Sequence, residues 1–138
     1  MDSNVVFKTN QGCIRHLSQL NGVFMESKGF MSHVEYKTLM ENAYRLIIEK
    51  DLKYWISDLR NMRVITTENQ KWTNEVFLPR VMKTTRIKKV AIIVGTNVFT
   101  AISMEIIKKE LAKLNMPIKY FNSFEEAESW FKSISVAA

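Results

Sequence analysis

Cysteine and histidine are scarce in this chain of 138 residues. The single cysteine, Cys13, excludes an internal disulfide and is typical of a protein from a reducing compartment. The two histidines, His16 and His33, belong to no cluster with the spacing of metal ligands, so the sequence predicts no metal site. Cys13 and His16 form an isolated C-x-x-H, and on a strand they would point to opposite faces.

Motifs for nucleotide binding and for nucleophilic catalysis are also missing. The chain contains no G-x-G-x-x-G and no G-x-S-x-G pattern. The segment Gly95-Thr96-Asn97 lacks the second glycine and the Lys-Ser/Thr pair of a P-loop. Asp58 has no carboxylate neighbour in the sequence with which to share acid–base chemistry. We therefore predict that the protein is not an enzyme and that it carries no cofactor.

Long apolar segments are absent as well. The longest apolar run, Val90–Val94, is far shorter than a membrane span. The first residues, MDSNVVFKTNQG, do not combine a basic start with a long apolar run, so no signal peptide is predicted. Together with the lone cysteine, these features predict a cytoplasmic protein.

The overall composition is that of an ordinary soluble globular protein, with 46% hydrophobic and 25% charged residues, and the length fits a single domain over residues 1–138. The net charge of +6 would attract nucleic acid, acidic lipid or an acidic protein. The basic residues are interleaved with acids, which favours a solvated surface instead. Only Arg80–Lys89 holds five basic residues and no acid. This run fits a phosphate-binding patch or, more simply, cations that offset a helix dipole.

The periodicity of apolar residues predicts an α/β fold with a four- or five-stranded mixed, mostly parallel sheet and about four helices. A strand, a long helix and another strand in succession indicate a right-handed crossover. The predicted strands are Val5–Lys8, Cys13–Leu20, Tyr54–Leu59, Val90–Val94 and Met116–Phe121. The predicted helices are Ser32–Lys50, one that begins at Glu68 and kinks or restarts at Pro79, one that ends near Leu114, and one from Phe124 to the C-terminus.

The stretch from Val23 to Met31 is unusually apolar for a loop between a strand and a helix. It could fold over the core, line a pocket or contact another subunit, and core packing is the commonest of the three. If a pocket exists, Phe24, Phe30 and Trp72 are its candidate apolar residues. Aromatic residues that follow core periodicity argue against nucleic-acid binding, which needs exposed aromatics among basic residues on one face.

The most informative stretch is Tyr54–Trp72, which reads as a strand, a loop and the start of a helix. The sequence Thr67-Glu68-Asn69-Gln70 has the pattern of a capping box, in which the Thr67 hydroxyl accepts a backbone N–H and Gln70 reaches back to Thr67. The helix is therefore predicted to begin at Glu68, whose charge opposes the positive end of the helix dipole.

The segment DLRNMRVITTENQ resembles the central segment of the STAS family, the sulphate transporter and anti-sigma antagonist domains. That family usually reads Asp-Leu-Ser-x-Val-x-x-Ile-Asp-Ser-Ser-Gly-Leu. The pair Asp58-Leu59 falls on its opening pair, and Thr67 falls on the serine that anti-sigma antagonists phosphorylate. Among the departures from the pattern, Thr66 replaces the acidic residue, Glu68 the second serine and Asn69 the glycine.

The whole chain more closely resembles the divergent SpoIIAA-like group of that family. The resemblance implies a STAS-like fold and a non-enzymatic protein-interaction or regulatory module that binds a protein partner or itself as a homodimer, with Thr67 as a candidate phosphosite. It also implies an alternative, a carrier or sensor of a lipophilic small molecule, because the group is similar in fold to a lipid-carrier class. Since binding crevices of open α/β sheets lie beyond the carboxyl ends of the strands, the candidate partner-binding residues are Asp58, Arg60, Thr66, Thr67, Glu68, Thr96 and Asn97.

Overall fold

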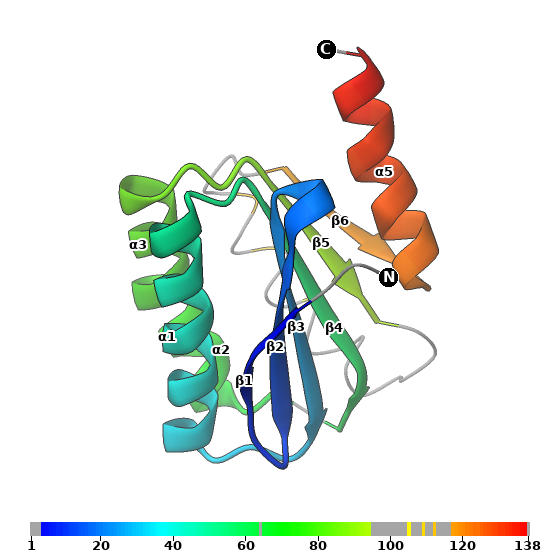
Figure 1. The fold of residues 1–138 in the computed structure, drawn as a ribbon. Helices are drawn as coiled ribbons and strands as arrows, with labels where there is room; N and C mark the ends of the chain where they lie inside the picture. Colours follow the sequence, from blue (N-terminus) through cyan, green and yellow to red (C-terminus); the bar gives the residue numbers. More distant parts are fainter. Residues whose placement is uncertain are drawn as a thin grey trace.

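The computed structural model describes residues 4–63, 65–94, 105, 109, 112 and 117–137. These residues form a six-stranded mixed sheet with helices on both faces (Figure 1). The strands are β1 (Asn4–Lys8), β2 (Gly12–Leu17), β3 (Gly22–Gly29), β4 (Tyr54–Met62), β5 (Lys89–Ile93) and β6 (Ile118–Phe121). The helices are the 3-10 helix η1 (Ser18–Leu20), α1 (His33–Lys50), the consecutive segments α2 (Thr67–Trp72), η2 (Thr73–Phe77) and α3 (Leu78–Thr84), and α5 (Phe124–Ala137).

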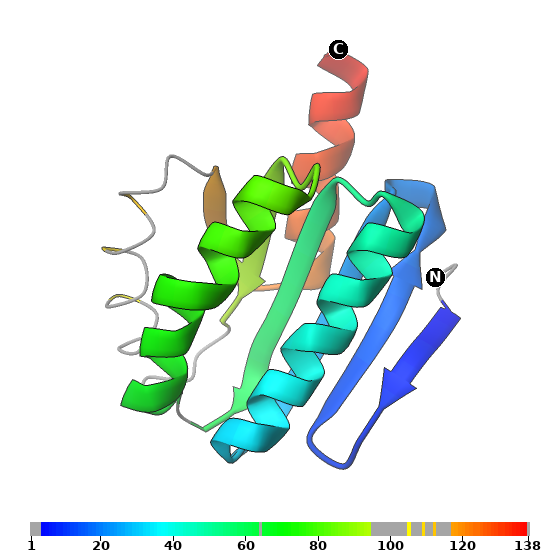
Figure 2. The ribbon, with the colours of Figure 1, turned by 90° about the vertical axis from the view of Figure 1, so that its left-hand side faces the viewer.

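The six strands lie in the sheet in chain order. The pairs β1–β2 and β2–β3 are antiparallel, whereas β3, β4, β5 and β6 run parallel to one another. Helix α1 connects β3 to β4, and the segments from α2 to α3 connect β4 to β5. These helices cover one face of the sheet, and α5 lies on the other (Figure 2). The α/β class and the mixed, mostly parallel sheet are thus confirmed.

The predicted number of strands is wrong, because the apolar stretch after Asn21 is strand β3 and not a loop. Val23 and Met25 pack on the side of α1, whereas Phe24 packs on the side of α5. A strand that is covered on both faces loses the alternation of apolar and polar residues by which strands are recognised. Three helical bodies are described rather than four. The helix predicted to end near Leu114 falls almost wholly outside the described residues.

Two apolar cores hold the layers together. The larger core lies between the sheet and the helices α1 to α3, and its fully buried side chains include Phe77, Leu39 and Ile47. The smaller core lies under α5, where Phe124 and Phe131 pack on the opposite face of the sheet. Both faces of the central strand β4 are therefore buried.

A π-helical turn, η2, marks the place where the sequence predicts a kink or restart of the helix at Pro79. In this turn the backbone N–H of Leu78 donates to the carbonyl of Thr73, one residue further back than in an α-helix. Pro79 has no N–H, and its ring would crowd the carbonyl of Glu75 in a regular helix. The wider turn lets helical backbone continue from α2 into α3.

Candidate functional site

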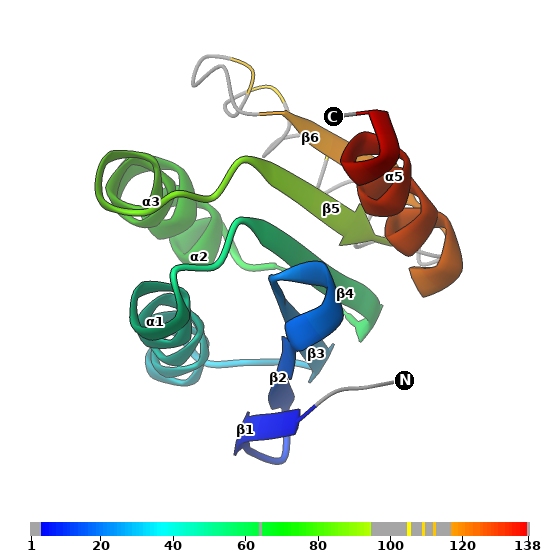
Figure 3. The same ribbon diagram turned by 45° about the horizontal axis from the view of Figure 1, so that its top comes forward.

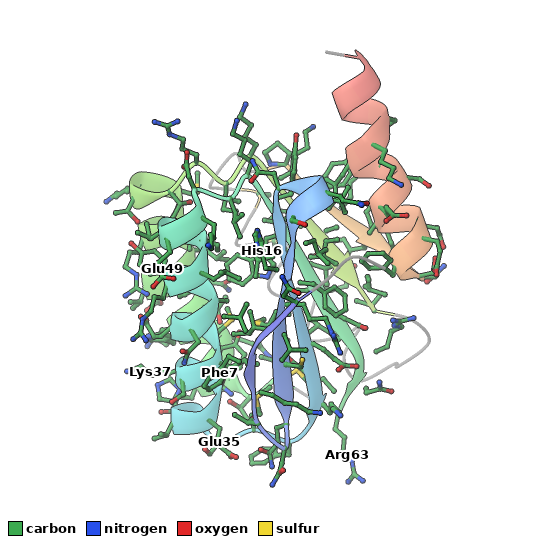
Figure 4. The ribbon with its side chains drawn as sticks, in the orientation of Figure 1. Phe7, His16, Glu35, Lys37, Glu49 and Arg63 are labelled. Carbon is green, nitrogen blue, oxygen red and sulfur yellow. The ribbon has the colours of Figure 1, made fainter. Side chains whose placement is uncertain are left out.

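The carboxyl ends of the parallel strands meet at one edge of the sheet, which we call the carboxyl edge. Figure 4 shows Glu35 and Arg63 at this end of the molecule, with Glu49 toward the opposite end. Asp58 and Arg60 lie in the last part of β4. The other described candidates, Thr66, Thr67 and Glu68, follow it at the start of α2, whereas Thr96 and Asn97 lie outside the described residues.

Asp58 and Arg60 form a bidentate ion pair. The Arg60 Nε and Nη2 atoms donate to the two carboxylate oxygens of Asp58 at 2.9 and 2.8 Å. The carboxylate is 2% exposed, whereas the guanidinium reaches solvent. The hydrogen bonds from Arg60 to Asp58 raise the pKa of Arg60 above its ordinary value, and the charges of Glu26 and Glu125 add to the effect. The guanidinium of Arg60 therefore keeps its positive charge.

A bulge in β4 explains why the pair forms at this place. Glu26 pairs with Asp58 and Lys28 with Asn61, so β4 has one residue more than β3 over this interval. The Asp58 carboxylate accepts the backbone N–H of Arg60 at 3.1 Å as well as its side chain. The Asp58 side chain thus accepts a backbone N–H in the distorted part of the β-ladder. Buried N–H groups need such a partner. This arrangement gives Asp58 a structural role.

Helix α2 begins one residue earlier than the capping-box pattern predicts. The N-cap is Thr66, whose hydroxyl accepts the N–H of Asn69 at 3.1 Å, and Thr67 is the first helical residue. Gln70 does not reach back to Thr67; its side-chain amide donates to the carbonyl of Ile65 at 2.7 Å. The prediction that Thr67 caps the helix is therefore wrong. Its side chain stands exposed on the first turn instead.

The start of α1 lies beside the start of α2. The backbone N–H of Arg63 donates to the carbonyl of Gly29 at 3.0 Å, which joins the segments that follow β3 and β4. The His33 Nδ1 atom lies 2.8 Å from the Asn69 Oδ1 atom, and the His33 Nε2 atom lies 3.7 Å from a carboxylate oxygen of Glu68. Sequence analysis missed both His33 and Asn69 as members of this site, since no local pattern links residues so far apart.

A chain of hydrogen bonds runs inward from Asn69. Its backbone carbonyl accepts the Thr73 hydroxyl at 2.7 Å, and the Tyr36 hydroxyl lies 2.6 Å from the same Thr73 oxygen. Because a threonine hydroxyl has one hydrogen to donate, Tyr36 is the donor in that second bond. Helix α1 and the segment η2 are thereby joined through a buried polar contact as well as through apolar packing.

The buried phenol of Tyr36 predicts a loss of stability at alkaline pH. Burial raises the pKa of Tyr36 from 10.0 to about 12, which means that the fold holds the neutral form. The neutral phenol contributes its full stabilisation below the pKa of the unfolded state, 10.0. This stabilisation is lost as the pH rises from 10 to about 12. We expect Tyr36→Phe to reduce the alkaline loss of unfolding free energy by about 2 kcal/mol, measured by urea unfolding across this pH range. An unchanged alkaline loss would contradict it.

Two large apolar side chains are exposed beside the carboxyl edge. Phe30, which directly follows β3, is 58% exposed, and Val34, in the first turn of α1, is 73% exposed. Arg63, Thr67 and Glu68 are exposed near them on the neighbouring segment. Exposed apolar residues with a charged surround are typical of a surface that contacts another protein.

The three candidate pocket residues are not brought together. Phe24 packs against Phe124 of α5 with ring centroids 5.6 Å apart. Trp72 packs on the opposite face of the sheet, where its ring contacts His33, Tyr36 and Phe77. Phe30 is largely in solvent. The structure therefore gives no shared pocket to these residues.

A small cavity does lie in the larger core, between the sheet and the helices. Its volume is about 60 Å³, and its walls are mostly apolar, with Met25, Ser27 and Trp55 among them. The Ser27 hydroxyl and the Trp55 indole N–H are buried and have no hydrogen-bond partner within the described part of the chain. An apolar cavity that holds benzene measures roughly 150 Å³, so this space is sufficient for a few water molecules and not for a lipid.

The unpaired Ser27 hydroxyl predicts a stabilising substitution. Ser27→Val removes a buried polar group, fills part of the cavity and suits a strand, so we expect the free energy of unfolding to rise by about 1 kcal/mol. Chemical denaturation measures this change. Ser57→Val, at a less buried serine that lines the same cavity, should give a smaller gain. A lower stability of Ser27→Val would show that the hydroxyl is bonded to water in the cavity.

No protein-family model matches the chain. No curated protein matches its sequence either. Within the described residues, no three His, Cys, Asp or Glu side chains lie together as a metal site requires. Across the same residues, no helix has both the length and the apolar character to cross a membrane. Proposals about function therefore depend on the geometry of the carboxyl edge.

Proposed function

We propose that the chain is a non-enzymatic interaction module of the SpoIIAA-like or STAS type, located in the cytoplasm. It would present the carboxyl edge to a protein partner or to a second copy of itself. The observation that carries the proposal is the exposure of Phe30 and Val34 beside the charged start of α2. Large apolar residues within a polar rim are the usual anchors of protein interfaces.

The rigidity of the carboxyl edge supports this proposal. The Arg63–Gly29 backbone bond and the His33–Asn69 contact hold the two neighbouring segments in one arrangement. A surface that is already ordered loses little conformational entropy when it binds. The exposed hydroxyl of Thr67 suits a regulatory phosphate, because a helix N-terminus stabilises negative charge. The negative charge of Glu68 would repel that phosphate and weaken its stabilisation by the helix N-terminus.

The test uses paired substitutions at and away from the carboxyl edge. We expect Phe30→Ser and Thr67→Glu to weaken association at least ~10-fold, as loss of an interface anchor does. Ile48→Ser and Thr38→Glu are the matched controls, since both residues are exposed on α1 and away from its first turn. Sedimentation velocity measures self-association, and quantitative mass spectrometry of the tagged protein from its own cells measures partner capture. Unchanged association of both edge variants would refute the proposal.

A carrier or sensor of a lipophilic small molecule is the second candidate. The cavity beside β3 is the observation that favours it. Ligand pockets usually measure roughly 300–1,000 Å³, so a cavity of about 60 Å³ limits such a ligand to a very small molecule. A native mass spectrum tests this candidate, because a bound ligand adds mass that denaturation releases. A spectrum without added mass would leave only the interaction module.

A further inference from the structure

A second concave surface lies at the opposite end of the sheet from the carboxyl edge. It is a groove of about 480 Å³ between η1, the start of β4 and α5. Figure 3, in which the top of the molecule comes forward, shows η1 and α5 at this end. Its volume falls in the range of roughly 300–1,000 Å³ that is usual for small-molecule sites.

One part of the groove is apolar. Leu20, Tyr54 and Phe131 line it. The ring of Tyr54 packs on that of Phe131, with centroids 4.8 Å apart and planes inclined by 34°, so Tyr54 provides the aromatic surface of the groove and Phe131 supports it from the core. Phe131 is fully buried in the smaller core, which fixes its position. An aromatic ring or a short hydrocarbon chain would remove this surface from water.

The other lining residues are cationic or neutral, and none is acidic. They are Gln19, Asn21, Lys53 and Lys132. Lys132 lies 3.6 Å from Glu128, its neighbour one turn earlier on α5. Lys53 has no ion pair among the described residues, since the nearby Asp51 instead pairs with Arg86 at 3.4 Å. The groove therefore offers an ammonium group that no described carboxylate neutralises.

The backbone that bears these groups is held firmly. Asn21 adopts a left-handed conformation with φ of 53°, in which its N–H donates to the carbonyl of Ser18. Its own carbonyl accepts the N–H of Lys53 at 3.0 Å. The next residue is Gly22, where an added Cβ would lie 3.1 Å from the carbonyl oxygen of Tyr54. Residues 21 and 22 thus approach β4 closely, and the groove is formed before any ligand arrives.

Further cations lie on the neighbouring strands, outside the lining of the groove. The backbone N–H of Lys88 donates to the carbonyl of Lys53, which places β5 and its lysines alongside. Lys89 and Lys119 lie 5.2 and 5.4 Å from the ring centroid of Trp130, the residue before Phe131. A local excess of positive charge raises the concentration of anions at such a surface.

We propose that the groove between η1 and α5 binds a small organic anion. The ring or short chain of the ligand would lie on Leu20 and Tyr54, and its carboxylate or phosphate would bind the ammonium groups of Lys53 and Lys132. The bounded volume favours a small molecule over a polymer. This inference is independent of the proposed interaction module, because the two surfaces lie at opposite ends of β4.

The test is a titration of the isotope-labelled protein, followed by the chemical shifts of its backbone amides. Phenyl phosphate carries both parts of the proposed ligand, inorganic phosphate only the anion, and phenol only the ring. We expect phenyl phosphate to shift the amides of residues 18–22, 53–54 and 131–132 and to bind at least ~10-fold more tightly than either fragment. Lys53→Gln should weaken its binding about 5-fold, the effect of one partly exposed ion pair.

Lys50→Gln is the control, since it removes the same charge from the end of α1 without altering the groove lining. The proposal fails if Lys50→Gln weakens binding as much as Lys53→Gln, or if inorganic phosphate binds as tightly as phenyl phosphate. It also fails if a single-stranded DNA oligonucleotide binds more tightly and shifts mainly the amides of Lys88, Lys89 and Lys119. Thermal melting of each variant confirms that the fold is intact.

Discussion

Replacing Asp58 with alanine is expected to lower the free energy of unfolding by about 3 kcal/mol. The buried carboxylate accepts three hydrogen bonds from Arg60, one from its backbone and two from its side chain. Hydrogen bonds to a charged group contribute roughly 1.5–3 kcal/mol each, but the guanidinium regains water in the variant, so the effects do not add in full. The N–H of Arg60 at the bulge would lose its partner.

Urea unfolding of three variants checks the role of Asp58. Asp58→Asn keeps an oxygen that can accept the Arg60 N–H, so it should cost less than alanine. Arg86→Ala breaks the exposed pair with Asp51 and should change stability by less than about 0.5 kcal/mol. If Asp58→Ala costs no more than Arg86→Ala, the carboxylate does not hold the bulge.

Replacing Phe131 with alanine should cost about 3–4 kcal/mol, the usual effect of emptying a buried phenylalanine site. Phe131 is 1% exposed and belongs to the small core that fixes α5 to the sheet. Among the described side chains of α5, Phe124 and Ala127 are the other buried members of this core. Because Phe131 belongs to this core and not to the larger one, much of this loss should fall on α5 itself.

Hydrogen exchange can separate detachment of α5 from unfolding of the whole protein. In Phe131→Ala, the amides of α5 should exchange faster by a larger factor than those of α1. Phe30→Ala is the matched control, because it makes the same chemical change at a side chain that is 58% exposed. An equal increase of exchange in α1 and α5 would show that the helix does not detach independently.

Local signals in the sequence predict the first helix well. Ser32 is its N-cap, and the reciprocal bonds between Ser32 and Glu35 form a capping box, the pattern that Ser32-His33-Val34-Glu35 has in the sequence. The bond from Ser32 also lowers the pKa of the exposed Glu35. A capping box depends on four consecutive residues, so it can be recognised from the sequence without knowledge of the rest of the fold.

The predictions of strand β3 and of the first residue of α2 are wrong for different reasons. Burial on both faces removes the alternation that would identify β3, and this burial depends on helices far away in the sequence. At α2, Thr66 and Thr67 are equally good caps by residue type, so the pattern cannot choose between them. The loop before the helix selects Thr66 as the N-cap, since the Gln70 side chain donates to the carbonyl of Ile65.

In the candidate site, too, the sequence indicates contacts between near neighbours and does not indicate contacts between distant residues. Asp58 and Arg60 are two residues apart, so their ion pair is a local contact between residues that the sequence already places together. His33 and Asn69 are joined only by the packing of two helices, so no sequence pattern could reveal their contact. The groove beside η1 likewise combines three distant segments, of which only the final fold shows the proximity.

The position of β4 bears on thermodynamic linkage between the two proposed sites. This nine-residue strand begins at the groove and ends at the carboxyl edge, a separation of roughly 25 Å. It is hydrogen-bonded to a parallel neighbour on each side, so moving it would break bonds to both β3 and β5. A ligand shifts an equilibrium only between arrangements for which its affinity differs. We therefore expect the coupling free energy to be close to zero. An anion in the groove should leave the affinity of a protein partner unchanged, and, by reciprocity, the partner should leave the affinity of the anion unchanged.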